Sequence, residues 1–214
     1  MVTKSSSGPP MKHERSCAGP VCGIDEAGRA PLAGPVVAGC VHIPAAAVPS
    51  TLWPPVRDSK KVPQPLREEL FGLITEAACY GIGQASVEEI DALNIHHATL
   101  LAMARAQEAM MRAFPVVPEL ALVDGKFVPK TLPCPGMAIV GGDDISRSIA
   151  AASIIAKVHR DRMMCTLHAA FPHFGWDRNA GYPTPEHIRA VRQHGPALHH
   201  RRTFGVVKEL VQAS

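Results

Sequence analysis

The stretch Gly23-Ile-Asp-Glu-Ala-Gly-Arg-Ala-Pro-Leu-Ala-Gly-Pro-Val-Val37 joins two apolar runs through a segment rich in glycine and proline. The first run, residues 20–25, is short and ends in an acid, and the second, residues 36–43, is rich in β-branched residues. Short apolar runs bounded by turn-forming residues are typical of buried strands. The stretch therefore predicts two neighbouring strands with a turn between them.

Two acidic residues, Asp25 and Glu26, stand at the end of the first predicted strand. A carboxylate is costly at the end of an apolar run unless it is paired or bound to a cation. Adjacent side chains on a straight strand point to opposite faces, so both acids serve one site only if the strand is frayed or kinked there. Ala27-Gly28, which follows directly, permits such a kink.

The rest of the chain alternates strands and helices. Apolar residues recur at three- and four-residue steps over residues 66–74 and, most clearly, over residues 95–113, which predicts two amphipathic helices. Residues 148–170 predict a long helix whose small residues let it lie close against a sheet. Further strands are expected at 80–87, 120–123 and 137–140, and further helices at 186–193 and 206–211. The alternation predicts an α/β fold with a helical C-terminal addition.

Acidic residues also follow the last two predicted strands. Asp124 comes directly after the strand at 120–123, Asp143 comes shortly after the strand at 137–140, and each is next to a glycine. Three strand ends can thus gather four carboxylates, which are the oxygen ligands that Mg²⁺ and Mn²⁺ prefer. Each acid alone has a plainer interpretation, because Asp124-Gly125 is a common turn signal and Asp143 or Asp144 favours the positive N-terminus of the following helix. Together they make a two-metal phosphodiesterase the leading chemistry.

A turn and several cations accompany these acids. Exposed backbone amides at Gly28-Arg29-Ala30, together with the arginine, predict a phosphate or sugar contact, and the alternative is a tight turn with a solvent-facing arginine. Lys60 and Lys157 add positive charge, although charge runs of this kind are usually solvated surface.

The composition limits the other classes of protein. The chain has 214 residues and a net charge of +3, so it lacks the strongly basic field that would by itself indicate a nucleic-acid partner. No apolar run has the length of a membrane span, and the first residues contain no apolar block of the length that a secretory signal requires. The six cysteines contain no C-x-x-C pair. We therefore expect a cytoplasmic protein with reduced thiols and no membrane contact.

The domain organisation is expected to be simple. Residues 1–19 are rich in Ser, Gly, Pro and charge, and we expect them to form a disordered tail because they cannot bury enough apolar area to offset the entropy of ordering. Residues 20–214 are expected to form a single domain that includes a C-terminal helical segment from about residue 185.

The motifs over roughly residues 20–205 closely resemble those of ribonuclease HII, the bacterial type 2 ribonuclease H. The most specific are the 23–37 stretch and Ser148-Ile-Ala-Ala-Ala-Ser153 with Ala156-Lys-Val158 and Arg160-Asp161. Further matches are Asp58-Ser-Lys-Lys61, Ile90-Asp-x-x-Asn-Ile-x-x-Ala-Thr99, Val123-Asp-Gly125, Gly142-Asp143 and Gly181-Tyr-Pro-Thr184 with Glu186-His187.

The resemblance implies a ribonuclease H-like fold, with a central mixed β-sheet flanked by helices. It also implies that two Mg²⁺ or Mn²⁺ ions are held by four catalytic acids, which map to Asp25, Glu26, Asp124 and Asp143. Asp143 is preferred because the family's pattern places the acid directly after glycine, and Asp144 is the neighbouring candidate.

The family that the chain resembles cleaves the RNA strand of RNA/DNA hybrids. It also nicks duplex DNA on the 5′ side of embedded ribonucleotides, leaving 3′-hydroxyl and 5′-phosphate ends, as needed in replication and repair. The resemblance implies that Gly28, Arg29, Ala30 and Tyr182 sense the 2′-hydroxyl at the RNA-to-DNA junction. Ala30 replaces the second glycine of the family's Gly-Arg-Gly turn. Alanine is tolerable there at negative φ, whereas recognition weakens if the turn needs positive φ or no side chain.

The remaining expectations concern binding. Phosphate contacts are assigned to Lys60, Lys157, His199, Arg201 and Arg202. Residues 206–214 either dock a replication partner such as a clamp or pack on their own domain, and a monomer is expected. Two alternatives stay open. One is a catalytically silent binder of hybrids, against which the full acid quartet argues. The other is a different two-metal phosphodiesterase, against which the Arg29 turn and the Gly-Tyr-Pro-Thr motif argue.

Overall fold

A single mixed sheet forms the centre of the computed structural model, which describes residues 9–44, 56 and 58–213. Its strands are β1 (Val21–Ala27), β2 (Val36–His42), β3 (Cys79–Ala85), β4 (Leu120–Asp124) and β5 (Gly136–Ile139). The order is β3-β2-β1-β4-β5. The first three strands form an antiparallel meander, and β1, β4 and β5 run parallel. All five predicted strands are present, which confirms the mixed sheet.

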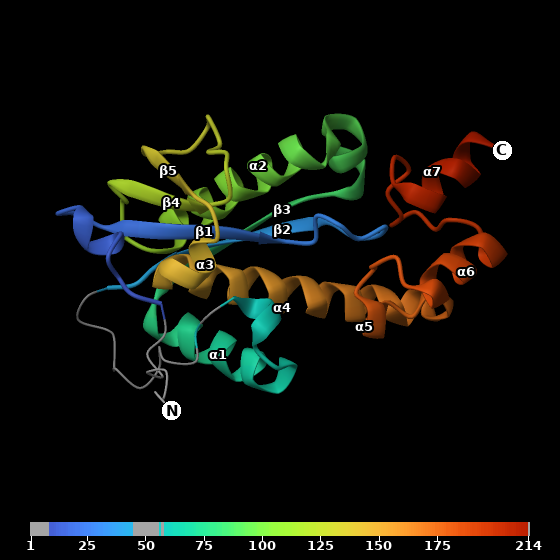
Figure 1. Ribbon diagram of the computed structural model, residues 1–214, viewed down its shortest axis with the longest axis horizontal. Helices are drawn as coiled ribbons and strands as arrows, with labels where there is room; N and C mark the ends of the chain where they lie inside the picture. The colour runs from blue at the N-terminus through green and yellow to red at the C-terminus, as the bar shows by residue number, and fades with distance from the viewer. Residues whose placement is uncertain (1–8, 45–55, 57, 214) are drawn as a thin grey trace, which may run out of the picture.

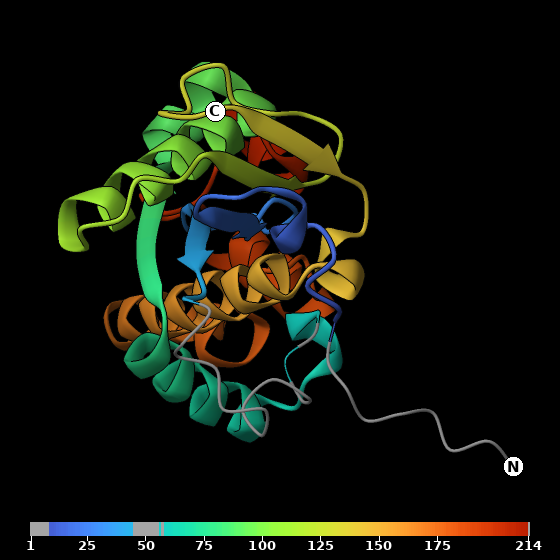
Figure 2. The ribbon, with the colours of Figure 1, turned by 90° about the vertical axis from the view of Figure 1, so that its left-hand side faces the viewer.

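Helices cover both faces of this sheet (Figure 1). The long ones are α1 (Gln64–Ala77), α2 (Val87–Ala113) and α4 (Arg147–Ala170), and the short ones are η1 (Glu14–Ser16), η3 (Ser59–Lys61), α3 (Gly142–Ile145), η4 (Pro172–Phe174), α5 (Trp176–Asn179), α6 (Pro185–His194) and α7 (Gly205–Gln212). Helix α2 packs on one face, α4 packs on the other, and Figure 2 shows α1 on the outer side of α4. This arrangement is the predicted α/β fold with a helical C-terminal extension.

The long helices approach the sheet closely because both surfaces are made of small residues. A Cβ atom added at Gly39 of β2 would lie 2.5 Å from the carbonyl oxygen of Ala152 in α4, and one added at Gly83 of β3 would lie 2.2 Å from that of Ala102 in α2. Such contacts are far shorter than van der Waals distance, so a larger residue at either glycine would push the helix away. The prediction that the small residues of 148–170 bring that helix close to a sheet is confirmed.

Helix α2 differs from the prediction at its start. The predicted helix began near residue 95, whereas α2 begins at Val87 with a capping box formed by Ser86 and Glu89. Asn94 then interrupts it with φ 67°, and its side chain accepts hydrogen bonds from the amides of His96 and His97. The apolar stripe therefore marks the second half of a kinked helix that has its own N-cap.

The N-terminal segment also differs from the prediction of a disordered tail over residues 1–19. Residues 9–19 pack on the domain, because the Glu14 carboxylate accepts hydrogen bonds from the amide and hydroxyl of Ser148 and from the hydroxyl of Ser146. A carboxylate at the first turn of α4 is favourable because free N–H groups and the positive end of the helix dipole lie there. Residues 1–8 lie outside the described residues.

The C-terminal helices pack around their own apolar cluster. Phe174 and Trp176 are buried there with Val191 and Val207, and Leu32 joins them from the turn that follows β1. Residues 172–185, for which no helix was predicted, contain η4 and α5. The C-terminal extension thus lies against the loop between β1 and β2. Across the described residues, no helix is long and apolar enough to cross a membrane.

Candidate metal centre

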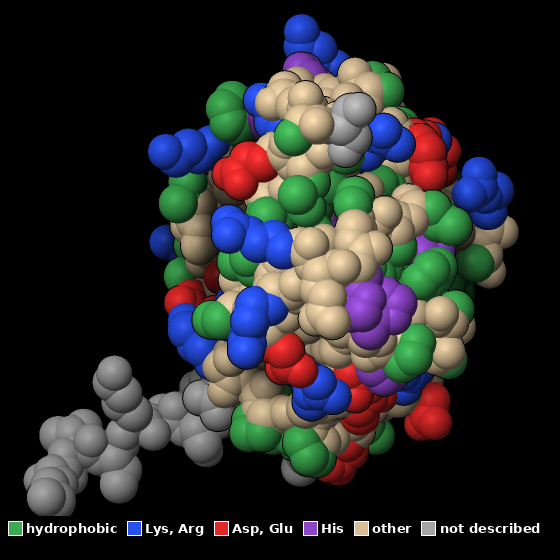
Figure 3. Space-filling view, turned by 90° about the vertical axis from the view of Figure 1, so that its right-hand side faces the viewer, with side chains coloured by type: hydrophobic (Ala, Val, Ile, Leu, Met, Phe, Trp, Pro, Cys, Tyr) green, Lys and Arg blue, Asp and Glu red, His purple; other side chains and the backbone are tan. Residues whose placement is uncertain are grey.

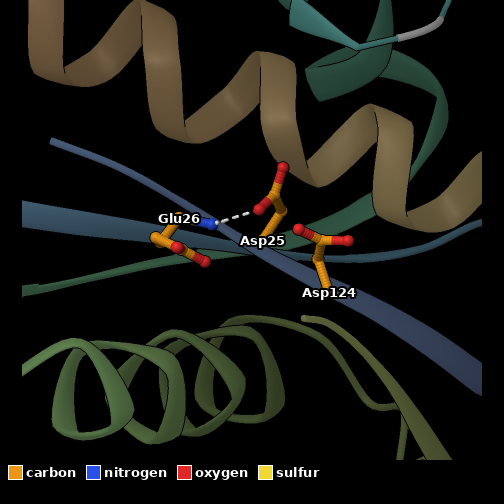
Figure 4. A group of neighbouring side chains, drawn as sticks. All are labelled: Asp25, Glu26 and Asp124. Carbon is orange, nitrogen blue, oxygen red and sulfur yellow. Dashed lines mark hydrogen bonds between the residues drawn. The ribbon is translucent and has the colours of Figure 1, made fainter. Parts of the chain in front are cut away.

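Three carboxylates meet where β1 and β4 end. The two strands are parallel neighbours with Ile24 opposite Val123, so the next residues, Asp25 and Asp124, lie side by side at the same end of the sheet. One carboxylate oxygen from each of these residues and from Glu26 lies within 4.8 Å of the others. Figure 4 shows the carboxylates of Asp25 and Asp124 next to each other, with Glu26 on the other side of β1.

The first strand is less distorted than expected. Its antiparallel pairing with β2 continues through Ala27, so the chain is neither frayed nor kinked at the two acids, and the turn begins at Gly28 with φ 95°. The Glu26 side chain is one methylene longer than that of Asp25 and reaches back toward the same end of the sheet. The Glu26 amide also donates a hydrogen bond of 2.7 Å to Oδ1 of Asp25, which fixes that carboxylate.

The electrostatics of this cluster favour a bound cation. Burial raises the pKa of Asp25 well above its ordinary value, and the neighbouring charges of Glu26 and Asp124 raise it further. Burial also raises the pKa of Glu26, although Arg29 acts in the opposite direction. Carboxylates that repel one another in a buried position are stabilised by a shared cation. Because every candidate ligand atom is a carboxylate oxygen, the site fits a hard divalent ion such as Mg²⁺ or Mn²⁺.

The fourth acid lies on α3, next to these three. Burial raises the pKa of Asp143, and the charges of Asp58 and Asp124 raise it further. The charge of Asp143 in turn raises the pKa of Asp25. Asp144 points elsewhere, because both of its carboxylate oxygens bind Nζ of Lys61 at 2.8 and 2.7 Å. The arrangement favours Asp143 over Asp144, although the oxygens of Asp143 are not within the 4.8 Å cluster.

The turn after β1 places a guanidinium beside the acids. Arg29 is half exposed, and its Nη1 lies 3.3 Å from Oε1 of Glu26. Positive φ occurs among the described non-glycine residues at Asn94 and Ala180, so Ala30 adopts negative φ. Alanine is therefore compatible with this backbone, and the Ala30 side chain is exposed.

The predicted phosphate contacts divide into two groups. Lys60 is exposed, and the carboxylates of Asp58, Asp25, Asp143 and Glu26 raise its pKa despite the opposing effect of burial. The charge of Lys60 is therefore near enough to the acid cluster to interact with it. The side chain of Arg202 is also exposed, so it is accessible to a phosphate.

Other members of the predicted set have different partners. Lys157 is largely buried, and its ammonium binds Oδ1 of Asp161 at 2.6 Å. His199 is partly buried against the rings of Phe171 and Trp176. Arg201 is 0% exposed and donates only to main-chain oxygens, so its prediction as a phosphate contact is wrong: a side chain removed from solvent does not reach a phosphate. At the end of the molecule that carries the C-terminal helices, Lys and Arg side chains are dispersed rather than gathered in one patch (Figure 3).

Tyr182 lies at the start of the segment that leads into α6. Its side chain is 37% exposed. Its carbonyl oxygen accepts a hydrogen bond from Nδ1 of His187, and its amide donates to the carbonyl oxygen of Asn179. The backbone of Tyr182 is thus held from both sides while the ring remains accessible.

Sequence reasoning missed two sets of residues at this site. Ser59 and Ser153 are buried, and their hydroxyls lie 2.7 Å apart, which fixes the loop that carries Lys60 to α4. Arg160 was named as part of a family motif and given no role of its own, yet it is buried beneath the turn after β1. Its neighbours His159, Asp161 and Arg162 are polar, so nothing in the local sequence distinguishes Arg160 from a surface cation.

Comparisons with known proteins agree on one family. The family model described as Ribonuclease HII matches residues 22–207. A ribonuclease HII from Paramagnetospirillum magneticum is 53% identical over 201 residues, which cover 94% of this chain and 98% of the relative. The ribonuclease in the PCNA:RNase HII complex from Archaeoglobus fulgidus aligns with a TM-score of 0.71 and 27% identity, over 87% of this chain and 95% of that one.

A more distant structure shares the fold. Bst-RNase HIII, solved in complex with Mn²⁺, aligns with a TM-score of 0.72 over 92% of this chain and 70% of its own. Its sequence identity of 17% supports the common ribonuclease H-like fold and nothing finer.

Proposed function

The chain belongs to the ribonuclease HII family, and on that premise we propose that it nicks duplex DNA on the 5′ side of embedded ribonucleotides and cleaves the RNA strand of RNA/DNA hybrids. Members of this family are metal-dependent endoribonucleases. The observation that carries the proposal is the group of carboxylates from Asp25, Glu26 and Asp124 at one end of the sheet. We place this activity in the cytoplasm, in ribonucleotide removal during replication and repair.

Asp25, Glu26, Asp124 and Asp143 are the residues that would hold the metal, and we propose two ions, Mg²⁺ or Mn²⁺. Bound ions of this kind would activate a water and stabilise the departing 3′ oxygen, giving 3′-hydroxyl and 5′-phosphate ends. The buried position of Asp25 supports this role, because its raised pKa reflects burial first and then repulsion by the neighbouring carboxylates, and a bound cation would offset both.

The chain's own residues would align the substrate on this centre. Gly28, Arg29 and Ala30 form the turn beside Glu26, and we propose that they and Tyr182 contact the sugar that carries the 2′-hydroxyl. This hydroxyl is the group that distinguishes a ribonucleotide from its DNA neighbours. Lys60 would bind a phosphate next to the acids, and Lys157 would support that loop from α4 through its ion pair with Asp161.

The test uses a labelled DNA duplex with a single ribonucleotide, incubated with Mg²⁺, Mn²⁺ or EDTA. Wild type is compared with Asp25→Asn, and a long RNA/DNA hybrid and an all-DNA duplex serve as parallel substrates. We expect a metal-dependent nick on the 5′ side of the ribonucleotide that Asp25→Asn loses. Binding without cleavage would instead indicate a silent hybrid binder, and cleavage of all-DNA would indicate a different phosphodiesterase.

A clamp contact is the remaining part of the proposal. A structural neighbour was solved as a PCNA:RNase HII complex, and we propose that the C-terminal segment of this chain, as a monomer, contacts a replication clamp. Val206 and Val207 of α7 are buried in their own domain, so the contact would use the exposed residues from Lys208 onward. Titration of the protein with the clamp, before and after removal of residues 212–214, tests this contact.

A further inference from the structure

Two fully buried arginines lie beneath the turn that follows β1. Arg160 of α4 is 1% exposed, and Arg201 in the segment before α7 is 0% exposed. Buried guanidinium groups usually pair with carboxylates. Within the described part of the chain neither arginine forms an ion pair, and both donate their hydrogen bonds to main-chain carbonyl oxygens.

Arg160 joins two segments that are far apart in the sequence. Its Nε and Nη2 donate to the carbonyl oxygens of Pro35 and Ala33 at 3.0 and 2.9 Å, and its Nη1 donates to that of Ala180 at 2.9 Å. Ala180 lies two residues before Tyr182. One planar guanidinium therefore connects the loop after β1 to the segment that carries the tyrosine.

Arg201 holds the same loop from its other end. Its Nη1 donates to the carbonyl oxygen of Arg29 at 2.9 Å, its Nη2 donates to that of Gly28, and its Nε donates to that of Gly34 at 3.0 Å. The orientation of both peptide groups that flank Arg29 is thus set by a side chain over 170 positions away in the sequence. The fork geometry of a guanidinium suits this task, because its donors are fixed in one plane.

The turn needs glycine at position 28 because Arg160 leaves no room for a side chain there. Gly28 has φ 95°, which favours glycine, and a Cβ atom added there would lie 2.0 Å from Nε of Arg160. Main-chain hydrogen bonds reinforce the same junction, since the amide of Leu32 donates to the carbonyl oxygen of Gly181 at 2.8 Å. The turn and the tyrosine segment therefore pack as one unit.

This arrangement carries an electrostatic cost. Burial lowers the pKa of Arg160 to about 10, and burial together with the charge of Arg160 lowers the pKa of Arg201 to about 9. Both guanidiniums remain protonated near neutral pH, so two buried positive charges that form no ion pair within the described residues lie beneath the turn after β1. Folding stability alone does not favour such a pair, because well-packed apolar residues would avoid the desolvation cost.

We propose that Arg160 and Arg201 are positioning residues that fix the Gly28-Arg29-Ala30 turn relative to Tyr182, and that this spacing determines selectivity for a single embedded ribonucleotide. The inference rests on the function proposed above. A lone ribonucleotide offers one 2′-hydroxyl in one place, so the turn and the tyrosine must be in register when it binds. A long hybrid offers a 2′-hydroxyl at every RNA residue and contacts along its length, so it tolerates a displaced turn better.

The test compares Arg160→Lys and Arg201→Lys with wild type on the single-ribonucleotide duplex and on the hybrid. Lysine keeps the charge but cannot span carbonyl oxygens on two segments. We expect kcat/KM on the single-ribonucleotide duplex to fall about 10- to 100-fold, because a small misplacement of a binding group has a cost of this size. The kcat/KM on the hybrid should fall less, so the ratio of kcat/KM on the single-ribonucleotide duplex to kcat/KM on the hybrid should also fall. Mn²⁺ binding should be unchanged, because neither arginine contacts the acids.

Arg162→Lys is the matched control, because it makes the same chemical change on the same helix at an exposed residue paired with Glu68. It should leave both substrates unaffected. Unchanged substrate ratios in folded Arg160→Lys and Arg201→Lys would overturn the inference while leaving the proposed function in place. A wild type that cleaves neither substrate would overturn the proposed function itself.

Hydrogen exchange of the wild-type protein provides a test that needs no variant. The amides of Leu32 and Gly34 donate to the carbonyl oxygens of Gly181 and His199, and they should exchange as slowly as those of β1 and β2 if the arginines hold the loop in this position. Fast exchange at these amides would overturn the inference even if both lysine variants failed to fold.

Discussion

Asp25 combines a proposed metal-binding position with an unfavourable environment. It is 5% exposed, and it lies next to two other carboxylates with one main-chain amide as its hydrogen-bond donor. Without a cation this carboxylate is desolvated and repelled, so it reduces the stability of the metal-free fold. Residues that bind or react are often kept at such a cost to stability.

The first prediction follows from that cost. Asp25→Asn should abolish metal-dependent cleavage, yet it should raise the free energy of unfolding of the metal-free protein by about 1 kcal/mol, because a neutral amide replaces a repelled charge. Urea unfolding in EDTA measures the stability, and Mn²⁺ should raise the Tm of wild type but not that of the variant. Asp144→Asn is the control, since Asp144 is paired with Lys61 away from the cluster. A metal-free Asp25→Asn protein much less stable than wild type would contradict the prediction.

Ala30 provides a second prediction. Its negative φ and exposed side chain indicate that the backbone conformation does not require glycine. Ala30→Gly should therefore change kcat/KM on the single-ribonucleotide duplex by less than about threefold, since neither strain nor a buried contact is removed. Steady-state cleavage by the two proteins side by side decides this. A gain of tenfold or more would mean that the methyl group itself obstructs the sugar.

The acids were predictable from the sequence, and the arginines were not. A carboxylate that follows an apolar strand is unusual, so Asp25, Glu26 and Asp124 were found from the strand ends, and β1 and β4 bring them together. Arg160 and Arg201 bond to main-chain carbonyls, which leave no mark in the sequence. The assignment of Arg201 to a phosphate failed because charge alone does not reveal burial.

The position of Asp25 depends on how closely α4 lies against the sheet. Asp25 pairs with Gly39 across β1 and β2, and Gly39 faces the carbonyl oxygen of Ala152 in α4. The run of small residues that brings the helix to the strands therefore also sets the distance from α4 to the proposed metal centre. A change in the contact between Gly39 and Ala152 should therefore displace both α4 and Asp25.

A pair of glycine substitutions tests this contact. Gly39→Ala should lower the free energy of unfolding by about 1–3 kcal/mol, because its Cβ would lie 2.5 Å from a main-chain oxygen that can move only with the helix. Gly72→Ala in α1 should raise it by about 0.5–1 kcal/mol, because nothing lies within 4 Å of the added methyl and alanine favours helix. Equal effects of the two substitutions in urea unfolding would contradict this packing.

Helix and strand positions were predictable where the apolar pattern is regular. The stripe over residues 95–113 marked the part of α2 whose residues face the core, but the pattern does not extend to its first turns, which are held by the Ser86 capping box instead. The short η4 and α5 were missed because their order comes from packing around Trp176 rather than from periodicity. Tertiary contacts outweigh local preference in such segments.

The fold as a whole depends on how the C-terminal helices are joined to the sheet. Trp176, His187 and His200 are buried between them, and their hydrogen bonds form one chain. His187 donates from Nδ1 to the carbonyl oxygen of Tyr182, so its Nε2 is the acceptor, and its one lone pair is shared between Nε1 of Trp176 at 3.0 Å and Nε2 of His200 at 3.1 Å. Nδ1 of His200 then accepts from the amide of Ala197. Each histidine is therefore neutral and in a single tautomer.

Acid should therefore loosen the C-terminal helices. Protonation would place a hydrogen on Nε2 of His187 or on Nδ1 of His200, where an N–H group already points, and burial with the charges of His187, His199 and His173 lowers the pKa of His200 to about 3. Burial lowers the pKa of His187 as well. Because the unfolded chain takes up protons near pH 6.5 and the folded chain does not, the free energy of unfolding should fall as pH drops below about 6.5. The slope should reach about 1.4 kcal/mol per pH unit for each histidine.

Urea unfolding in EDTA between pH 5 and pH 7.5 measures that slope. His200→Gln removes one of the two titrating groups, so its stability should depend less steeply on pH than that of wild type, even though it starts from a lower value at pH 7.5. The exposed His97 provides the control, because His97→Gln should keep the wild-type slope. Parallel curves for wild type and His200→Gln would show that this histidine is protonated equally in both states. The acid sensitivity of the fold would then have to come from His187 or from groups elsewhere in the chain.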